Sequence, residues 1–258
     1  MPNVQRPPKH LAAKKRFGQN FLIDDLVLAK IASAANITPG MRVIEIGPGR
    51  GALTCELIAA GGEVWAVEID RDLQSYLLER FSRVENFHLV PHDILQTRLA
   101  DAAPPKFKVV GNLPYNISTA ILERLADERQ LFTDAVLMFQ REVASRILAP
   151  PNSADRGFLS VIAQAAFEIE RLFDIGPKAF RPQPKVWSTV VRISPRPANV
   201  FDRGEVRSLV QKGFSQRRKM LRNTLKGVAL SSEVLDLSRR AESLTLDEWS
   251  QLAAAAIS

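Results

Sequence analysis

The sequence predicts an α/β protein with a seven-stranded, mostly parallel sheet, followed by a small domain made only of helices. Two observations support this fold. Short apolar runs typical of buried strands alternate with segments of helical spacing, and the closely spaced prolines of "SPRPANVFD" end this alternation. Alternating strands and helices are joined by right-handed crossovers, which produce a parallel sheet covered on both faces. We therefore expect one domain over residues 1–196 and a second over residues 197–258.

The predicted strands are short apolar runs rich in valine, isoleucine and phenylalanine, residue types that fit a buried, pleated surface. In chain order they are "MRVIEIG", "EVWAVEID", "FHLVPHD", "KFKVVGN", "TDAVLMF", "EIERLFDIG" and "WSTVVRISP".

The predicted helices lie between these strands and carry apolar residues three and four positions apart. In order they cover residues 25–35, "GALTCELIAAG", "RDLQSYLLERF", "STAILERLAD", "REVASRILA" and "GFLSVIAQAAF". In the C-terminal part, Thr245 and Glu248 have the spacing of a capping box. The apolar stripe that follows begins at Trp249, and we expect it to dock the helical domain on the α/β body.

Basic residues outnumber acidic ones by 35 to 28 among 258 residues, and the pI is about 9.8. Such a balance favours a polyanionic partner. The N-terminal cluster contains Arg6, Lys9, Lys14, Lys15 and Arg16, and a second cluster, placed on a predicted helix, contains Arg217, Arg218, Lys219, Arg222 and Lys226. We expect both clusters to contact nucleic-acid phosphates.

The chain has one cysteine, Cys55, so an internal disulfide and a cysteine metal cluster are excluded. Its helical spacing from Ala52 and Ile58 predicts a packing position. No apolar run approaches the length of a membrane span, and the N-terminus lacks the hydrophobic segment of a secretory signal. We expect a cytoplasmic protein that uses no metal.

A glycine loop follows the first strand of the sheet. Gly47, Gly49 and Gly51 of "VIEIGPGRG" stand between that strand and a helix, where glycines allow a ligand to approach the backbone closely. The second strand ends at Glu68, where a carboxylate can accept from both hydroxyls of a ribose. Asp70 is the rival acid, and we interpret it as the cap of the next helix.

The third strand ends near Asp93, which could accept from an adenine amine or could cap a loop. The glycine spacing is not that of dinucleotide binders, and no G-K-[ST] is present to hold a triphosphate. Together, the glycine loop and the two acids predict a site for S-adenosylmethionine.

The fourth strand ends in the stretch "GNLPY". The exocyclic nitrogen of adenine is a poor nucleophile because its lone pair is delocalised into the ring. The side-chain oxygen of Asn112 and the carbonyl of Leu113 could bind its N–H groups and localise that lone pair, while Pro114 fixes the carbonyl's direction. Tyr115 would stack on a base taken out of its helix. No general base is required, because the nitrogen becomes acidic only after it accepts the methyl group.

These motifs, taken together and in this order, resemble the rRNA adenine N6-methyltransferase family, and within it the bacterial small-subunit dimethyltransferases linked to kasugamycin sensitivity. The matching stretches are "KKRFGQNFLID", "EIGPGRGALT", "VEID", "GNLPYNIST", "FQREVASR", "FRPQPKVWSTVVR" and "FSQRRKMLRNTL". The resemblance covers Lys14 to about Leu225 and implies a Rossmann-like class I methyltransferase fold.

The resemblance also implies roles for individual residues. The cofactor-binding residues would be Asn20, Leu22, Gly47, Glu68, Asp93 and Asn112. Phe180 would stack on the target base opposite Tyr115, and the basic segment with Arg217, Arg218 and Arg222 would bind rRNA. One departure is Trp187, where the family more often has an acid, which leaves the role of this position open.

The family reaction is the transfer of two methyl groups to each of two adjacent adenosines near the 3′ end of 16S rRNA, within an immature 30S subunit. We expect the protein to act as a monomer. The competing interpretations are an erythromycin-resistance-type 23S rRNA methyltransferase, a non-catalytic assembly factor on the same fold, and a DNA adenine methylase. The intact Asn112, Glu68 and glycines argue against the non-catalytic factor. DNA enzymes usually carry D-P-P-Y or N-P-P-Y and a recognition domain for which this chain has no room.

Overall fold

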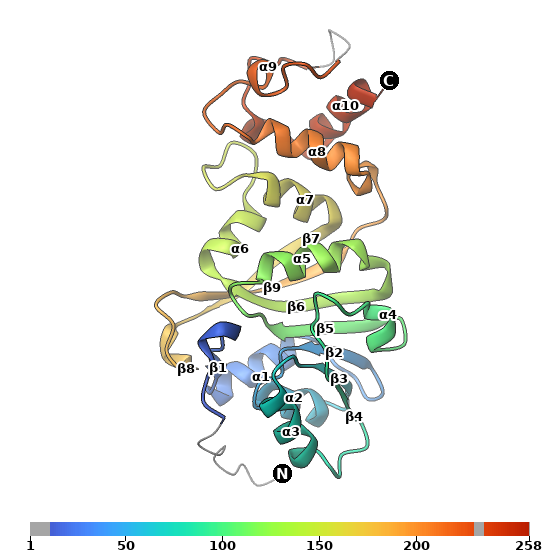
Figure 1. The fold of residues 1–258 in the computed structure, drawn as a ribbon, viewed down its shortest axis with the longest axis vertical. Coiled ribbons are helices and arrows are strands. Elements are labelled where there is room, and N and C mark those ends of the chain that lie inside the picture. The colour runs from blue at the N-terminus through green and yellow to red at the C-terminus, as the bar shows by residue number, and fades with distance from the viewer. Residues whose placement is uncertain (1–10, 230–234, 258) are drawn as a thin grey trace. The chain divides into compact units, whose positions relative to one another are not determined.

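The computed structural model describes residues 11–229 and 235–257, and it confirms the predicted seven-stranded sheet (Figure 1). The strand order is β4 (Phe87–Val90), β3 (Glu63–Val67), β2 (Arg42–Ile46), β5 (Phe107–Asn112), β6 (Phe132–Gln140), β9 (Ser188–Pro195) and β7 (Phe167–Ile175). The five strands from β4 to β6 are parallel, and β9 is antiparallel to β6. The sheet is thus mostly parallel, as predicted.

The order of the strands reverses beside β2. From β2 the chain moves outward through β3 and β4, then returns to the other side of β2 with β5. Ile46 at the end of β2 is paired with Gly111 near the end of β5. In open α/β sheets, ligands bind outside the carboxyl ends of the strands at such a switch point.

The helices of the α/β part agree with the predictions to within a few residues. They are α1 (Asp25–Ala34), α2 (Ala52–Ala59), α3 (Arg71–Arg80) and α5 (Ser118–Asp127), with a short additional helix α4 (Leu99–Ala102). Asp24 caps α1, because its side chain accepts from the backbone N–H of Val27. Asp70 caps α3 by accepting from the N–H of Asp72, which confirms the interpretation of Asp70 as a cap.

The core beneath the sheet joins α1 and α2 to the central strands. Leu28 and Ile31 of α1 are buried with Leu57 of α2, Val43 of β2 and Val110 of β5. These apolar residues recur at helical spacing on the helices and alternate on the strands, which is the pattern that predicted the fold. This packing fixes the glycine loop, because the loop connects β2 directly to α2.

A second, two-stranded sheet was not predicted. Strand β1 (Phe21–Leu22) pairs antiparallel with β8 (Phe180–Arg181), and Leu22 lies opposite Phe180. The two segments are far apart in the sequence, so no local pattern indicates the pairing. It ties the "GQNFL" segment to the stretch that precedes β9.

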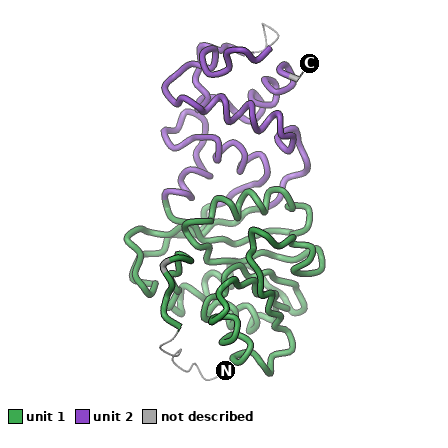
Figure 2. The backbone as a smooth tube through the Cα atoms, in the orientation of Figure 1, with its two compact units in different colours: residues 1–141, 171–193 green, residues 142–170, 194–258 purple. Residues whose placement is uncertain are grey.

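The chain forms two compact units, shown in two colours in Figure 2. The first contains residues 1–141 and 171–193, and the second contains residues 142–170 and 194–258. The chain thus passes into the second unit near the predicted boundary at residue 196, and residues 142–170, which we expected in the first domain, also lie in the second unit. They carry α6 (Arg141–Leu148) and α7 (Phe158–Ala166), whose helical pattern gives no indication of the unit to which they belong.

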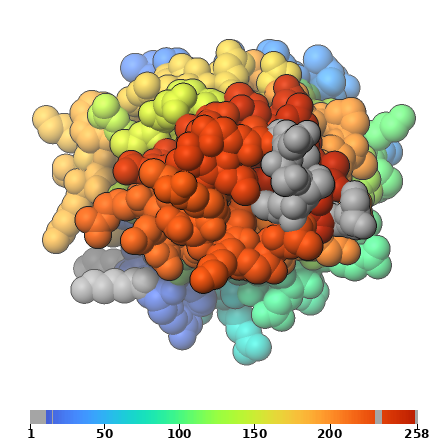
Figure 3. Space-filling model, turned by 90° about the horizontal axis from the view of Figure 1, so that it is seen from above, coloured from blue at the N-terminus to red at the C-terminus, as the bar shows by residue number. Residues whose placement is uncertain are grey.

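The second unit is helical. It adds α8 (Gly204–Gly213), α9 (Leu221–Thr224) and α10 (Leu246–Ile257) to the two helices above, and Figure 3 shows the surface of these three C-terminal helices in orange to red. The predicted capping box is confirmed, since Thr245 and Glu248 exchange side-chain-to-backbone hydrogen bonds of 2.8 and 3.1 Å. Trp249 is fully buried with Val161 of α7 and Val210 of α8. The stripe that begins at Trp249 therefore packs within the second unit, and the expectation that it docks on the α/β body is wrong.

No helix within the described residues is long and apolar enough to span a membrane.

Candidate active site

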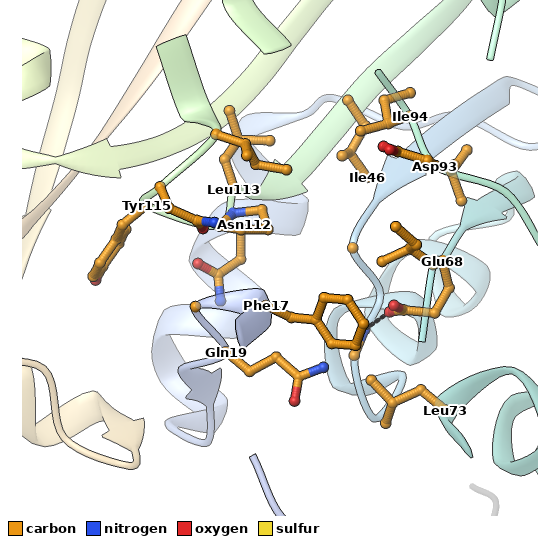
Figure 4. Close-up of a pocket in the computed structure, with 18 of the residues that line it drawn as sticks. Phe17, Gln19, Ile46, Glu68, Leu73, Asp93, Ile94, Asn112, Leu113 and Tyr115 are labelled. Carbon is orange, nitrogen blue, oxygen red and sulfur yellow. Dashed lines mark hydrogen bonds between the residues drawn. The ribbon is translucent and has the colours of Figure 1, made fainter. Parts of the chain in front are cut away.

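A cavity of about 240 Å³ opens at the switch point of the sheet (Figure 4). Five segments and Leu73 of α3 line it, and the segments are residues 16–21, 46–47 with Gly49, 67–69, 92–95 and 112–117. The predicted site residues in its lining are Asn20, Gly47, Glu68, Asp93, Asn112, Leu113 and Tyr115. Folding thus brings together residues predicted from five separate stretches of sequence.

The glycine loop has a backbone that other residues could adopt only with strain. Gly47, Gly49 and Gly51 all have positive φ values, of 69°, 57° and 74°. A Cβ atom on Gly49 would lie 3.0 Å from the ring of Phe21, and one on Gly51 would lie 2.7 Å from the ring of Phe81. The loop is thereby held in a shape that leaves its backbone open to a ligand.

Glu68 is placed in the cavity wall just after β3. Only 6% of its surface is exposed, and its carboxylate accepts from the backbone N–H of Gly49 at 3.3 Å and of Asp70 at 2.9 Å. Burial raises the pKa of Glu68 to about 7, although the backbone hydrogen bonds oppose the shift. The group can therefore be charged at physiological pH and is oriented by two fixed donors.

Asp93 caps the turn after β4, which is one of the two roles that the sequence left open. Its Oδ1 accepts from the N–H of Leu95 at 2.9 Å, and its Oδ2 accepts from the amide of Gln96 at 3.3 Å. The side chain caps the turn after β4 and also lines the cavity (Figure 4).

Asn112 lies across the cavity from Glu68, at the end of β5 (Figure 4). Its Nδ2 donates to the backbone carbonyl of Asn20 at 3.0 Å. This bond fixes the orientation of the amide, and within the described residues the oxygen keeps its capacity to accept. The acceptor role predicted for Asn112 needs this arrangement.

Tyr115 is half-buried at the same side of the cavity, and its hydroxyl forms a 2.7 Å hydrogen bond with the hydroxyl of Ser188. Burial raises the pKa of the tyrosine, so it stays neutral. Ser188 was not predicted as a site residue. It follows Trp187 at the start of β9, and only the tertiary pairing of β9 with β6 brings it near the "NLPY" stretch.

Two further lining residues, Phe17 and Gln19, were also missed. Both belong to the "KKRFGQNFLID" stretch, and Figure 4 shows the ring of Phe17 between the Asn112 side and the Glu68 side of the cavity. The motif itself was the available signal, since it contains these residues next to Asn20.

A second cavity of about 210 Å³ adjoins the first, because Phe21, Gly47, Gly49 and Asn112 line both. Leu22 lines this second cavity instead of the first. Its wall also includes Glu45, a fully buried carboxyl that accepts from the hydroxyl of Thr54 at 2.6 Å. Burial raises the pKa of Glu45 to about 8.

The stacking role predicted for Phe180 is not supported. The side chain has no exposed surface, lies in the core with Leu22, Leu28 and Val190, and lines neither cavity. The β1–β8 pairing is the cause, because it directs the ring inward. Trp187, in contrast, is 49% exposed, and its ring lies against Gly176.

The basic segment of the second unit differs from its prediction. Arg217 and Arg218 lie in a turn, and the helix α9 begins only at Leu221. The guanidinium of Arg217 donates to the backbone carbonyls of Ala154 and Arg156 in the same unit. Arg218 and Arg222 are exposed. The N-terminal cluster also changes, because Lys14 is bonded to Asp70 and Asp72; Arg6 and Lys9 lie outside the described residues.

Cys55 is half-buried on α2, and a guanidinium nitrogen of Arg80 lies 3.3 Å from its sulfur. Within the described residues, no three histidine, cysteine or acidic side chains are grouped as metal ligands would be.

The mostly parallel sheet, the strained glycine loop and the acids at the ends of β3 and β4 define a class I methyltransferase. The polar groups of the site suit S-adenosylmethionine, because the acids can accept hydrogen bonds from ribose and adenine and the glycine backbone is open to a ligand. The protein-family model described as "Ribosomal RNA adenine dimethylase" matches residues 10–255 of this chain. The chain belongs to this family, whose members are S-adenosylmethionine-dependent enzymes that act on rRNA adenines.

Relatives and solved structures agree with this assignment. "Ribosomal RNA small subunit methyltransferase A" of Hahella chejuensis is 42% identical over 93% of this chain and 92% of its own. The protein of the same name from Aromatoleum aromaticum is 46% identical over 83% of this chain and 81% of its own. A dimethyladenosine transferase structure from Plasmodium falciparum matches with a TM-score of 0.77 and 27% identity, covering 90% of this chain and 95% of that one. The 23S rRNA methyltransferase ErmE matches at 0.63 and 26%, covering 93% and 100%.

Proposed function

We propose that this protein dimethylates the exocyclic amines of two adjacent adenosines near the 3′ end of 16S rRNA. It acts as a cytoplasmic monomer on an immature 30S subunit. The two relatives named for the small subunit and the structure named dimethyladenosine transferase support this target. The observation that supports the chemistry is the hydrogen bond from Asn112 to the carbonyl of Asn20, which commits the amide nitrogen and leaves the oxygen as an acceptor at the cavity.

S-adenosylmethionine would supply the methyl group without a metal, and this chain's residues would hold it in the two adjoining cavities. Glu68, at the end of β3, would accept from the ribose hydroxyls, and Asp93, at the end of β4, would accept from the adenine amine. Gly47 and the segment of Asn20 and Leu22 would contact the remainder of the cofactor, because they line the cavities between these acids and Asn112.

Asn112 and Leu113 would act on the target adenine. An acceptor at Asn112 Oδ1 and the Leu113 carbonyl bind the two N–H groups and draw the nitrogen lone pair out of conjugation. Tyr115 would stack on the base, and its hydrogen bond to Ser188 holds the ring in place. The attraction between these acceptors and the nitrogen grows as the nitrogen becomes positive, so the interaction favours the transition state over the bound substrate.

Small subunits from cells lacking the gene would test this function. Mass spectrometry of their 16S rRNA should show two unmethylated adjacent adenosines near the 3′ end, and the purified protein with S-adenosylmethionine should restore four methyl groups. Methylation of 23S rRNA instead would support the erythromycin-resistance-type alternative. Binding to subunits without any transfer would support a non-catalytic assembly factor.

A further inference from the structure

The segment from Leu11 to Asn20 is anchored beside the cavity at its start. Leu11 is buried in a small cluster with Phe21 and Leu73. Its carbonyl accepts from the guanidinium of Arg50 at 2.9 Å, and this guanidinium lies over the ring of Phe21. These contacts hold the start of the segment in place beside the cavity.

Lys14 and Gln19 attach the same segment to the start of α3. The ammonium of Lys14 lies 2.5 Å from Asp70 Oδ1 and 2.6 Å from Asp72 Oδ2. The amide of Gln19 donates to Asp70 Oδ2 at 3.0 Å and accepts from the backbone N–H of Lys14 at 2.8 Å. Both oxygens of Asp70 are thus occupied by residues that stand on either side of Phe17 in the sequence. We call Lys14, Gln19, Asp70 and Asp72 the latch.

Asp70 also connects the latch to the predicted ribose acid. Its backbone N–H donates to Glu68 Oε1 at 2.9 Å, and the side chain of Gln74 donates to the Glu68 carbonyl at 2.8 Å. Only 2% of Asp70 is exposed. Burial alone would raise the pKa of Asp70, but the hydrogen bonds from Lys14 and Gln19 outweigh it, so the pKa is lowered and the latch keeps a carboxylate.

We propose that Asp70 is a positioning residue that couples the closed position of the Lys14–Gln19 segment to the alignment of Glu68, and so sets how long the cofactor stays bound. The inference rests on the proposed use of S-adenosylmethionine. Phe17 lines the cavity and stands between the latch residues Lys14 and Gln19 in the sequence. Loss of the latch contacts would therefore allow the Phe17 ring to leave the cavity. Closure and ribose binding then occur together, because one aspartate takes part in both.

The test measures the dissociation of S-adenosylmethionine from the full-length protein by stopped-flow fluorescence or surface plasmon resonance. Lys14→Met should raise the dissociation rate constant about threefold to tenfold, the size expected when a partly exposed ion pair is lost. KM for the cofactor should rise with it, while the single-turnover rate at saturating cofactor stays the same. Lys14→Arg should restore slow dissociation. Added salt should speed dissociation from the parent protein more than from Lys14→Met.

The ion pair between Lys108 and Asp134 provides the matched control, since its atoms are 2.6 Å apart in the same unit and neither residue lines either of the two cavities described above. Lys108→Met should leave cofactor dissociation unchanged. Gln19→Ala is a second, independent test of the latch, because it removes the other side-chain donor to Asp70 and should also speed dissociation. Dissociation from both Lys14→Met and Gln19→Ala at the parental rate would overturn the latch. A parent protein that binds no S-adenosylmethionine would instead overturn the proposed function.

Discussion

The two units use their charged side chains in opposite ways. In the first unit, Glu45 and Glu68 are buried in the walls of the two cavities, and Asp70 is buried two residues beyond Glu68. All three accept from donors of the chain. In the second unit, Arg218 and Arg222 are exposed. Where that unit does bury a guanidinium, at Arg156, it donates to backbone carbonyls. The first unit thus prepares oriented acceptors for a small ligand, whereas the second leaves cations available to a large, negatively charged partner.

Asn112→Ala should produce the largest effect, and it acts only on the first unit. Loss of one preorganised acceptor costs about 2.7–4 kcal/mol, so single-turnover methylation of under-methylated small subunits should slow about a hundredfold to a thousandfold. Subunit binding should change little, because the cations of the second unit remain. Asn112→Asp should keep more activity than the alanine variant, since it retains an acceptor of the same shape.

Asn86→Ala is the control for this experiment, because it also removes an amide that donates to a backbone carbonyl, at 2.7 Å, but lies outside both cavities. It should transfer methyl groups at the parental rate. If Asn112→Ala does the same, Asn112 is only a structural turn residue.

Glu68→Ala should produce the next largest effect. Hydrogen bonds to a charged group contribute about 1.5–3 kcal/mol each, so loss of even one of the two ribose hydrogen bonds should make S-adenosylmethionine binding about tenfold to a hundredfold weaker by calorimetry. Glu63→Ala, at the opposite end of β3, is the control and should bind normally. Unchanged affinity in a folded Glu68→Ala protein would remove Glu68 from the site.

The pH dependence of cofactor binding sharpens the assignment of Glu68. With a pKa raised to about 7, Glu68 takes up a proton as the pH falls through 7 and becomes a poorer acceptor. Affinity should therefore decrease below this pH in the parent protein. The affinity of Glu68→Gln should not decrease in this pH range. If the decrease persists in this variant, the titrating group is not Glu68.

Reversal of exposed charges tests the second unit. Arg218→Glu with Arg222→Glu should weaken binding to small subunits about tenfold and flatten the salt dependence by about 0.7–0.9 log units per lost phosphate contact. Adding Arg217→Glu should weaken binding further, but it also removes the contacts to Ala154 and Arg156, so its thermal midpoint must be checked.

The control is the double reversal of Arg203 and Arg240, whose side chains are 53% and 55% exposed in the same unit. It should bind subunits as the parent does. Equal losses in both double variants would indicate a general effect of charge, and no loss in either would show that the segment is a solvated face.

The smallest expected effect concerns Glu45 and protein stability. Burial raises its pKa from 4.5 to about 8, so the folded chain holds a proton that the unfolded chain releases between these values. The contribution to the free energy of unfolding is complete below pH 4.5 and is lost as the pH rises through 8. The thermal midpoint of Glu45→Gln should exceed that of the parent by a few degrees, and this difference should grow with pH between pH 6 and 9. Each kcal/mol of stability corresponds to about 2–4 °C. A constant difference across this range would contradict the shift.

The local patterns predicted the sheet and most of the cavity, but not the contacts made between distant segments. Gly47, Glu68, Asp93 and Asn112 each lie at or just beyond the carboxyl end of a strand, and parallel strands bring such positions to one edge. Ser188 reaches Tyr115, and Phe180 turns into the core, only because β9 and β8 pair with strands far away in the sequence. Helical spacing likewise predicted α6 and α7 but could not show that their apolar faces belong to the second unit.

This division of the chain has a consequence for dissecting the protein. The backbone passes between the units three times, after residues 141, 170 and 193. A fragment of residues 197–258 would lack Val161, Ile162 and Ala165 of α7, which bury Trp249 and Leu252. The complementary fragment would expose the same three side chains to water. Neither unit can therefore be separated as a fragment. Exchanging the second unit between relatives would require moving α6, α7 and the C-terminal helices together, with the junctions placed in the strands β7 and β9.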